Sequence, residues 1–203
     1  MTVTPPRHRA AKTVDCDVIS PAASRRSFLA SAASAIGLLL INRTASAARP
    51  VGTDRRIFLV HPYTGEEFRD IYWTEGRYRP EALWRINSLL RDHSADKIIG
   101  VDPQLIDVMA RLNARLGRSP DDPVEVISGY RSAETNAKAR KINRSVARNS
   151  FHMQGMAVDI RVKNVGLSQL RKAALTLEAG GVGTYPRRNY LHIDVGPVRT
   201  WGR

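Results

Sequence analysis

Residues 150–159 read SFHMQGMAVD, and they place a histidine and an aspartate in a segment of mostly apolar or small side chains. Such a segment is typical of a buried strand, where an ionised carboxylate without a partner costs free energy. Asp159 therefore needs a cation beside it. Gly155 and Ala157 are small enough for a turn to bring His152 back against the strand that carries Asp159.

Residues 189–196, NYLHIDVG, repeat this combination, because His192 and Asp194 stand in a second apolar strand. Zinc accepts imidazole nitrogen and carboxylate oxygen, and a catalytic zinc site typically has three protein ligands and one position open to water. If the two strands pair side by side, the histidine of the second strand becomes a third ligand for one ion. The predicted ligands of a single Zn2+ are His152, Asp159 and His192.

Each of these residues also has an ordinary structural explanation when it is taken alone. A histidine in an apolar strand commonly forms a hydrogen bond within the core, and a strand aspartate commonly pairs with an arginine or caps a turn. Other divalent cations also bind sites made of nitrogen and carboxylate ligands. The combination of H-x6-D in one segment with H-x-D in a distant one favours a shared ion over these separate explanations.

Hydrophobic periodicity outside these two segments predicts the remaining elements. Residues 57–73 contain two apolar runs around Thr64-Gly65, which is typical of a β-hairpin. The predicted helices span residues 80–93, 103–116, 132–142 and 167–177, and the predicted strands have the sequences VEVIS, MAVDIRV, GGVGTY and NYLHIDVG. The fold class expected is α+β, with a small antiparallel sheet and flanking helices.

The composition is that of a globular protein, with 42% hydrophobic and 25% charged residues in a chain of 203. Its formal net charge of +13 favours a polyanionic partner. Nucleic acid, bacterial cell-wall polymers and anionic lipid surfaces all meet that description, so charge does not choose among them.

The first 47 residues have the layout of an export signal. A pair of arginines, Arg25-Arg26, precedes an apolar run over residues 28–41, and Ala45-Ser46-Ala47 supplies the small residues of a cleavage site. The segment SRRSFL resembles the signature of the twin-arginine pathway. An uncleaved anchor or a buried helix is the alternative, although the run is short for a bilayer span.

Cleavage after residue 47 divides the chain into a signal peptide (1–47), a basic lead-in (48–56) and a folded domain (57–203). The signal peptide holds six Lys and Arg against two Asp, so the mature chain keeps a net charge of +9. Cys16 leaves with it, which removes any disulfide or thiolate ligand. We expect a periplasmic protein without a membrane span, whose partner is a cell-wall polymer and not nucleic acid.

Three segments, SGYRS, SFHMQGMAVDI and YLHIDVGPVRTW, carry a family resemblance. They resemble the signature blocks of the M15-type zinc peptidases, and in particular the branch of exported bacterial murein endopeptidases formerly called domain of unknown function 882. The resemblance extends over residues 57–201 and implies the α+β core shared with lysostaphin-like and D-Ala-D-Ala peptidases. The zinc ligands of that family fall on His152, Asp159 and His192.

The resemblance also implies a role for Arg131, in SGYRS. It falls on an arginine that related peptidases use near the scissile carbonyl or a substrate carboxylate. A guanidinium stabilises the oxyanion that develops during amide hydrolysis. A structural salt bridge to Glu134 or Glu125 is the alternative.

Many M15-type peptidases place an acidic general base three residues before the last zinc ligand, where this chain has Asn189. Asp194 is the nearest carboxylate, and strand alternation puts it on the same side of the sheet as His192. Two roles follow for Asp194. It acts as the general base, or it holds His192 in the tautomer that binds the metal.

The function implied is zinc-dependent hydrolysis of peptide bonds in peptidoglycan crosslinks or stem peptides, with Arg131 and Asp194 as catalytic residues. A D,D- or L,D-carboxypeptidase is the alternative within the same chemistry, because an arginine also binds a terminal carboxylate. A wall-binding module that keeps zinc without turnover is the alternative from another class, and Asn189 at the base position supports it. A nucleic-acid binder is supported by the net charge alone.

Overall fold

A computed structural model of the chain describes residues 54–144 and 146–202. The chain divides into two units, Met1–Ser46 and Ala47–Arg203, and all described residues belong to the second. The expected signal peptide therefore lies outside the described residues, as does most of the expected lead-in. Strand β1 begins at Arg55, so the last two residues of that lead-in belong to a sheet.

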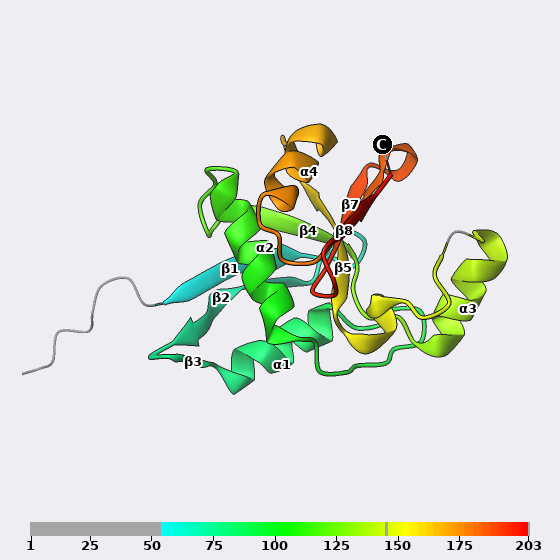
Figure 1. The fold of residues 1–203 in the computed structure, drawn as a ribbon. Helices are drawn as coiled ribbons and strands as arrows, with labels where there is room; N and C mark the ends of the chain where they lie inside the picture. The colour runs from blue at the N-terminus through cyan, green and yellow to red at the C-terminus, as the bar shows by residue number, and fades with distance from the viewer. Residues whose placement is uncertain (1–53, 145, 203) are drawn as a thin grey trace, which may run out of the picture. The chain divides into compact units, whose positions relative to one another are not determined.

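A mixed sheet of eight strands forms the centre of the described part (Figure 1). The strands follow the order β3-β2-β1-β4-β5-β7-β6-β8. Their bounds are Arg55–Val60 (β1), Glu67–Thr74 (β2), Arg77–Tyr78 (β3), Pro123–Ser128 (β4), Ala157–Val162 (β5), Gly181–Tyr185 (β6), Tyr190–Asp194 (β7) and Arg199–Trp201 (β8). Together with the helices described below, this sheet confirms the α+β prediction.

The sheet differs from the small antiparallel sheet expected from the sequence. Within the described residues five neighbouring pairs are antiparallel, but β1–β4 and β6–β8 are parallel. A parallel pair requires a long connection, and two strands and two helices separate β1 from β4 along the chain. Local periodicity identifies a strand but not its partner, so these pairings could not be predicted from it.

The predicted hairpin around Thr64-Gly65 is confirmed as β1 and β2. The four predicted helices are also present, as α1 (Pro80–Leu89), α2 (Pro103–Arg115), α3 (Ala133–Ile142) and α4 (Leu167–Leu175). Helix α1 ends earlier than expected, because the Asp92 carboxylate accepts hydrogen bonds from the backbone N–H groups of Ser94 and Ala95 and forms a turn. No helix among the described residues has the length and apolarity that a bilayer span requires.

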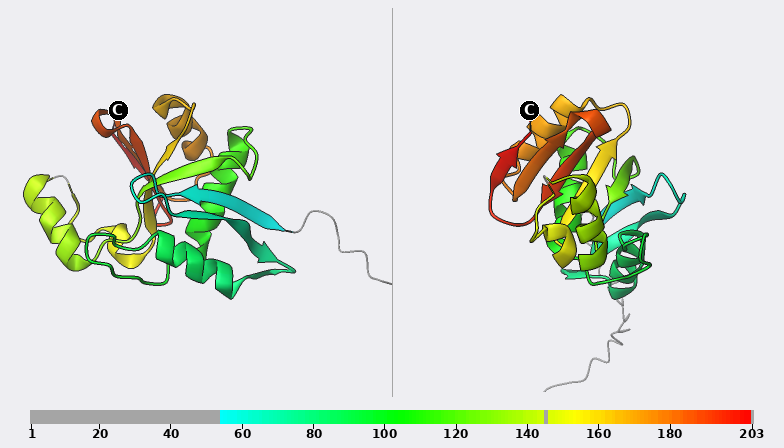
Figure 2. Two further views of the ribbon diagram at one scale, coloured as in Figure 1. Left: turned by 180° about the vertical axis from the view of Figure 1, so that it is seen from behind. Right: turned by 90° about the vertical axis from the view of Figure 1, so that its right-hand side faces the viewer.

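The hydrophobic core lies on one face of the sheet, under α1, α2 and α4 (Figures 1 and 2). Alternate residues of β5 and β7 point into this core, namely Val158, Ile160, Val162, Leu191 and Ile193. Successive residues of a strand point to opposite faces. Asp159 and His192 therefore point to the other face of the sheet, where the candidate site is built.

Helix α3 stands apart from this arrangement. Figures 1 and 2 show it projecting away from the sheet, joined to the rest through the segments before and after it. Asn136 is its one buried residue. Ser132 caps the helix by accepting a hydrogen bond from the backbone N–H of Thr135. Because α3 contributes little to the core, its faces are available to line cavities.

Candidate metal centre

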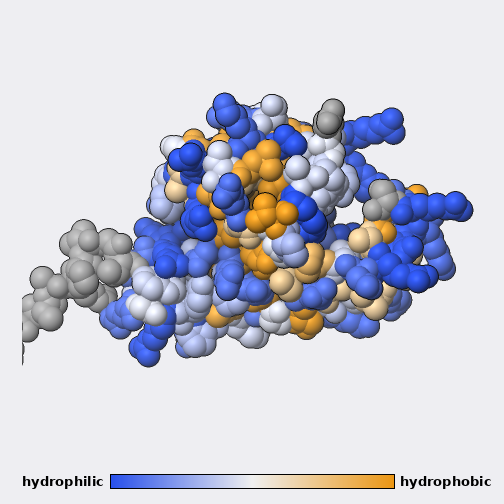
Figure 3. All heavy atoms as spheres, viewed as in Figure 1, coloured by the Kyte–Doolittle hydropathy of each residue, from blue (hydrophilic) through white to orange (hydrophobic). Residues whose placement is uncertain are grey.

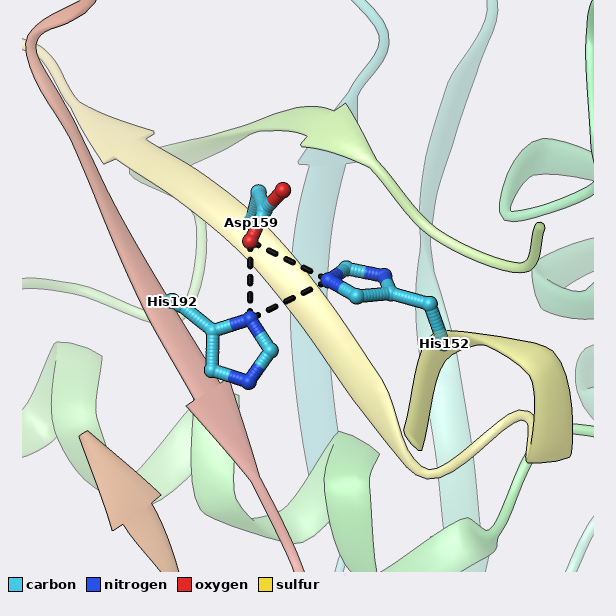
Figure 4. A group of neighbouring side chains, drawn as sticks. All are labelled: His152, Asp159 and His192. Atoms are coloured by element: carbon cyan, nitrogen blue, oxygen red, sulfur yellow. Dashed lines mark hydrogen bonds and ion pairs between the residues drawn. The ribbon is translucent and has the colours of Figure 1, made fainter. Parts of the chain in front are cut away.

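Strands β5 and β7 bring the two predicted motifs together, since they pair with Asp159 directly opposite His192. His152 lies on η1, a single 3-10 turn from Phe151–Gln154, and Gly155 then turns the chain back at φ 68°. A side chain at this glycine would collide with the backbone carbonyl of Gly100, in the loop before α2. The turn expected from the small residues is thus present, and the three side chains converge (Figure 4).

Three potential ligand atoms face one another at this point. Nε2 of His152 lies 3.2 Å from Oδ1 of Asp159, Nδ1 of His192 lies 2.9 Å from the same oxygen, and the two nitrogens are 3.1 Å apart. A tetrahedral zinc ion with bonds of about 2.0–2.1 Å separates its ligands by roughly 3.3 Å. The triangle is therefore close to one face of such a tetrahedron. Among the described residues, these three form the one group of histidine, cysteine and carboxylate side chains that could hold a metal ion.

The other hydrogen bonds of the two rings fix which nitrogen carries the proton. Nδ1 of His152 lies 2.7 Å from the carbonyl oxygen of Gly129 and donates to it. Nε2 of His192 lies 3.0 Å from Oδ2 of Asp194 and donates to that oxygen. The atoms that face Asp159 are then two nitrogen lone pairs. Three acceptors within 3.2 Å repel one another unless a cation lies between them, and this donor set fits a metal ion.

Burial and mutual contact set the charge states of the same residues. Burial lowers the pKa of His152 below its ordinary value, although Asp159 opposes this. Burial acts to raise the pKa of Asp159, but the two histidines outweigh it and the pKa falls well below its ordinary value. Burial also disfavours the charged form of His192, yet the neighbouring carboxylates of Asp159 and Asp194 raise its pKa overall. A neutral His152 beside an ionised Asp159 is the combination that binds a metal.

Asp194 contacts Nε2 of His192, on the opposite side of the ring from the nitrogen that faces Asp159, and 1% of its surface is exposed. Besides His192, the Arg199 guanidinium donates to its two oxygens at 2.7 and 2.9 Å, and the backbone N–H groups of Gly181 and Gly196 donate at 3.0 and 2.9 Å. Burial acts to raise the pKa of Asp194, but His192 and Arg199 hold it well below its ordinary value. These five donors suit a residue that positions His192, whereas a general base needs an oxygen that faces the substrate.

Two glycines of β6 allow the last strand to reach the site. Gly181 pairs with Arg199 and Gly183 with Trp201. A Cβ at either glycine would overlap the Arg199 guanidinium or the Trp201 indole. Because glycine has no Cβ, the indole fits beside β6, and its ring centroid lies 5.1 Å from that of His192. Strand β8 therefore contacts His192 directly through Trp201 and indirectly through the carboxylate that Arg199 holds.

A cleft of about 680 Å³ opens over the three ligand atoms. The sheet and the η2 turn (Pro186–Arg188) line one side of it, and α3 with the loop that follows lines the other. Figure 3 shows the gap between α3 and the body of the domain. Among the described residues that line the cleft, Asp159 is the one carboxylate, whereas three arginines line it: Arg131, Arg188 and Arg199, the last of which is paired with Asp194. The cleft is therefore suited to a substrate that bears carboxylates.

The guanidinium of Arg131 forms no ion pair with a carboxylate among the described residues. Its Nε is buried and has no hydrogen-bond partner there. Glu134 pairs with Lys138 and Glu125 pairs with Arg161, so neither salt bridge of the structural alternative is formed. The placement of Arg131 in the cleft agrees with the expected contact to substrate.

Asn189 lies away from the cleft. It ends η2 in the left-handed conformation, its carbonyl oxygen accepts a hydrogen bond from Nε of Arg161 at 2.9 Å, and it lines a separate hollow beside Glu125. The position expected for a general base is thus outside the cleft in this chain. Ser150 accepts a hydrogen bond from the backbone N–H of His152 at 3.3 Å and caps the turn that carries this histidine.

Comparison with known proteins accounts for this combination of fold and site. Residues 49–201 match the model of an M15 peptidase family described as peptidoglycan L,D-endopeptidase MepK. The chain belongs to this family. The peptidoglycan L,D-endopeptidase MepK of Escherichia coli K12 is 41% identical over 179 residues, which cover 88% of this chain and 97% of the relative.

A second MepK relative, the probable peptidoglycan L,D-endopeptidase of Haemophilus influenzae Rd, is 34% identical over 178 residues, or 88% of this chain and 95% of the relative. The solved structure of Serratia marcescens L-Ala D-Glu endopeptidase ChiX matches at 24% identity, covering 39% of this chain and 62% of that one. Its TM-score of 0.31 is too low to bear on the fold.

For this M15 peptidase, reasoning from the sequence found the residues that face the metal position and Asp194 beside His192, but missed Arg199 and Trp201. Arg199 and Trp201 stand two residues apart in YLHIDVGPVRTW, a spacing that puts both on one face of a strand. A further indication of this contact in the sequence is the pair of alternate glycines in GGVGTY, because glycine within a strand commonly marks the close approach of another group.

Proposed function

We propose that the chain is a zinc-dependent endopeptidase that hydrolyses peptide bonds of peptidoglycan, including the L,D bonds named in the descriptions of its relatives. The observation that carries the proposal is the convergence of three acceptor atoms within 3.2 Å, from His152, Asp159 and His192. Membership of the M15 family and a cationic cleft over these atoms support it.

Zinc, when bound by these three residues, supplies a Lewis acid that activates water and polarises the substrate carbonyl. The side chains of this protein bind and orient the reactants. Arg131 donates to the carbonyl oxygen of the scissile bond as negative charge develops there. Asp194 keeps the proton of His192 on Nε2, and Arg199 keeps Asp194 ionised, so that Nδ1 of His192 would be free to bind the metal. We therefore assign Asp194 a positioning role, and not that of the general base.

We also propose that residues 1–47 direct export through the twin-arginine pathway and are then removed. The mature protein would begin at residue 48 and act in the periplasm. The paired arginines, the apolar run after them and the Ala-Ser-Ala segment support this proposal. Peptidoglycan as a substrate requires the same location.

A product assay combined with metal analysis tests the function. The purified protein is incubated with sacculi and with soluble muropeptides, before and after chelation, and the products are identified by mass. New fragments should include peptides of two or more residues, and their formation should stop with the chelator and return with zinc. Release of single terminal residues alone would instead indicate a carboxypeptidase, and no zinc-dependent product from either substrate would refute the proposal.

A further inference from the structure

Helix α3 carries a second concave surface that the metal centre does not use. A groove of about 570 Å³ runs along it and contains no carboxylate among the described residues that line it. Four cationic side chains line the groove together with one amide and one thioether: Arg140, Lys141, Arg144 and Arg148, with Asn136 and Met153.

The groove and the catalytic cleft use different faces of the same helix. Ala139 and Ile142 line the cleft. The helix residues that line the groove are Ala133, Asn136, Ala137, Arg140 and Lys141. Each set follows the three- or four-residue spacing of one helix face, and Arg144 joins the groove from just beyond the end of the helix. Helix α3 is therefore a wall that the cleft and the groove share.

Buried contacts hold the groove in shape. Asn136 is 2% exposed, and its Nδ2 donates to the carbonyl oxygens of Ala147 and Arg148 at 3.1 and 3.4 Å. These hydrogen bonds fasten the segment after α3 to the helix and place Arg148 at the groove. Met153, the neighbour of His152 on η1, also lines it, so the groove adjoins the support of the metal centre.

The cations of the groove have no carboxylate partner among the described residues. The acidic residue of α3, Glu134, binds Lys138 at 2.9 Å instead. Elsewhere on the surface, arginines have such partners, as Arg91 has Glu66 at 2.8 Å. Like charges gathered in a concave surface repel one another and concentrate counter-ions, so this groove attracts an anion.

We propose that the α3 groove is an exosite for the carboxylates of peptidoglycan stem peptides adjacent to the one in the cleft. The inference rests on the proposed function, because the same polymer then occupies both faces of α3. Guanidinium groups bind carboxylates through paired hydrogen bonds, which suits three arginines to this ligand. The exosite captures the polymer and takes no part in the chemical step.

The test compares a groove variant with a variant of matched charge. The triple variant Arg140→Gln, Arg144→Gln, Arg148→Gln loses three positive charges from the groove. The control Arg77→Gln, Arg111→Gln, Lys172→Gln loses three from exposed positions on β3, α2 and α4 that line neither cavity. Circular dichroism and zinc content establish that both variants are folded and loaded.

Binding to purified sacculi and turnover are then measured separately. The groove variant should bind sacculi about tenfold more weakly, as expected for three exposed ion pairs of modest strength, and should cleave sacculi with a raised KM. Its kcat on short soluble muropeptides should be unchanged, and the control should match wild type. Sacculi whose carboxyls are converted to carboxamides should bind the wild type at least as weakly as native sacculi bind the groove variant, because the cleft also loses its carboxylate contacts.

Three outcomes would overturn the exosite: equal losses in both variants, undiminished binding by the groove variant, or tighter binding of wild type to anionic lipid vesicles or RNA than to sacculi. Failure of the proposed function has a different signature. A wild type that binds sacculi through the groove, but yields no zinc-dependent product from either substrate, would refute the endopeptidase and retain the exosite.

Discussion

Two pairs of neighbouring histidines occupy different regions of the domain. His61 and His93 stack with ring centroids 4.0 Å apart, whereas the rings of His152 and His192 are 4.9 Å apart at an angle of 63°. In the stacked pair, Nδ1 of His61 accepts a hydrogen bond from the backbone N–H of Thr64, and Nε2 of His93 lies 3.0 Å from a backbone carbonyl oxygen. A carboxylate oxygen of Glu66 lies 3.9 Å from Nε2 of His93, and Arg91 binds this carboxylate at 2.8 Å.

The difference shows what makes a metal site in this chain. In the stacked pair, one nitrogen of each ring bonds the backbone, and no group of lone pairs converges with a carboxylate oxygen among the described residues. The second pair donates its protons outward, to a carbonyl and to Asp194, and leaves two lone pairs facing Asp159. Proximity of two imidazoles is therefore insufficient, and the partners on the far side of each ring decide the outcome.

The largest expected effect is on zinc binding, and it distinguishes the His152–His192 pair from the stacked His61–His93 pair. His192→Ala should abolish stoichiometric zinc binding and reduce peptidoglycan cleavage to the background, because one of three ligands is lost. His61→Asn with His93→Gln should retain both zinc and activity. Metal analysis after dialysis and the muropeptide assay measure the two properties. Loss of zinc from the stacked-pair variant would show that the distinction between the pairs is wrong.

The next largest effect tests the role of Asp194, which accepts the Nε2 proton of His192. Asp194→Asn should weaken zinc binding by about 10- to 100-fold, the range typical of residues that orient a metal ligand, because the Nε2 proton of His192 loses its charged acceptor. Competition with a chromogenic chelator measures the affinity.

Asp107→Asn is the matched control for that variant. Asp107 also accepts several hydrogen bonds, from Arg55, Tyr72 and Tyr78, but it lines neither the cleft nor the metal position. This control should reduce stability and leave zinc affinity unchanged. Equal zinc affinities for wild type and Asp194→Asn would remove the positioning role.

A smaller effect concerns the room that glycine leaves beside His192. Gly183→Ala places a methyl group where the Trp201 indole lies, and we expect overpacking to cost about 1–3 kcal/mol. Zinc affinity should fall less than in Asp194→Asn, and the tryptophan fluorescence should shift as the indole is displaced. Gly166→Ala, at a position with open space around it, should leave stability, zinc affinity and tryptophan fluorescence unchanged. Normal stability in Gly183→Ala would show that the close approach of β8 is unimportant.

The smallest effect is a pH dependence at the stacked pair. Burial lowers the pKa of His61 below 6.5, and His93 and Arg91 lower it further while Glu66 opposes them. As the pH falls through 6.5, the unfolded chain takes up a proton that the folded chain does not, so stability present above this pH is lost. Chelated wild type should therefore lose more free energy of unfolding on acidification than His61→Asn in the same buffers. Parallel denaturant titrations at several pH values measure this, and identical pH profiles would contradict it.

Much of the candidate site could be predicted because each signal is local. A polar residue within an apolar strand is visible in the sequence, and alternation gives the face on which it lies, so His152, Asp159 and His192 were found together. Alternation also placed Asp194 on the same face of the sheet as His192. It did not predict which ring nitrogen of His192 the Asp194 carboxylate contacts. That contact depends on Arg199, which reaches it only because β8 pairs with β6.

The amino-acid sequence by itself determined six of the eight strands of the described residues, most helix positions and the three residues that face the metal position, since these follow from periodicity within a few residues. Only the tertiary structure decided that β1 lies beside β4 and that Asp194 supports His192 while Asn189 lies outside the cleft. It also decided that α3 separates two cavities. These features depend on contacts between residues far apart in the chain, and the free energy of such contacts has no signature in local spacing.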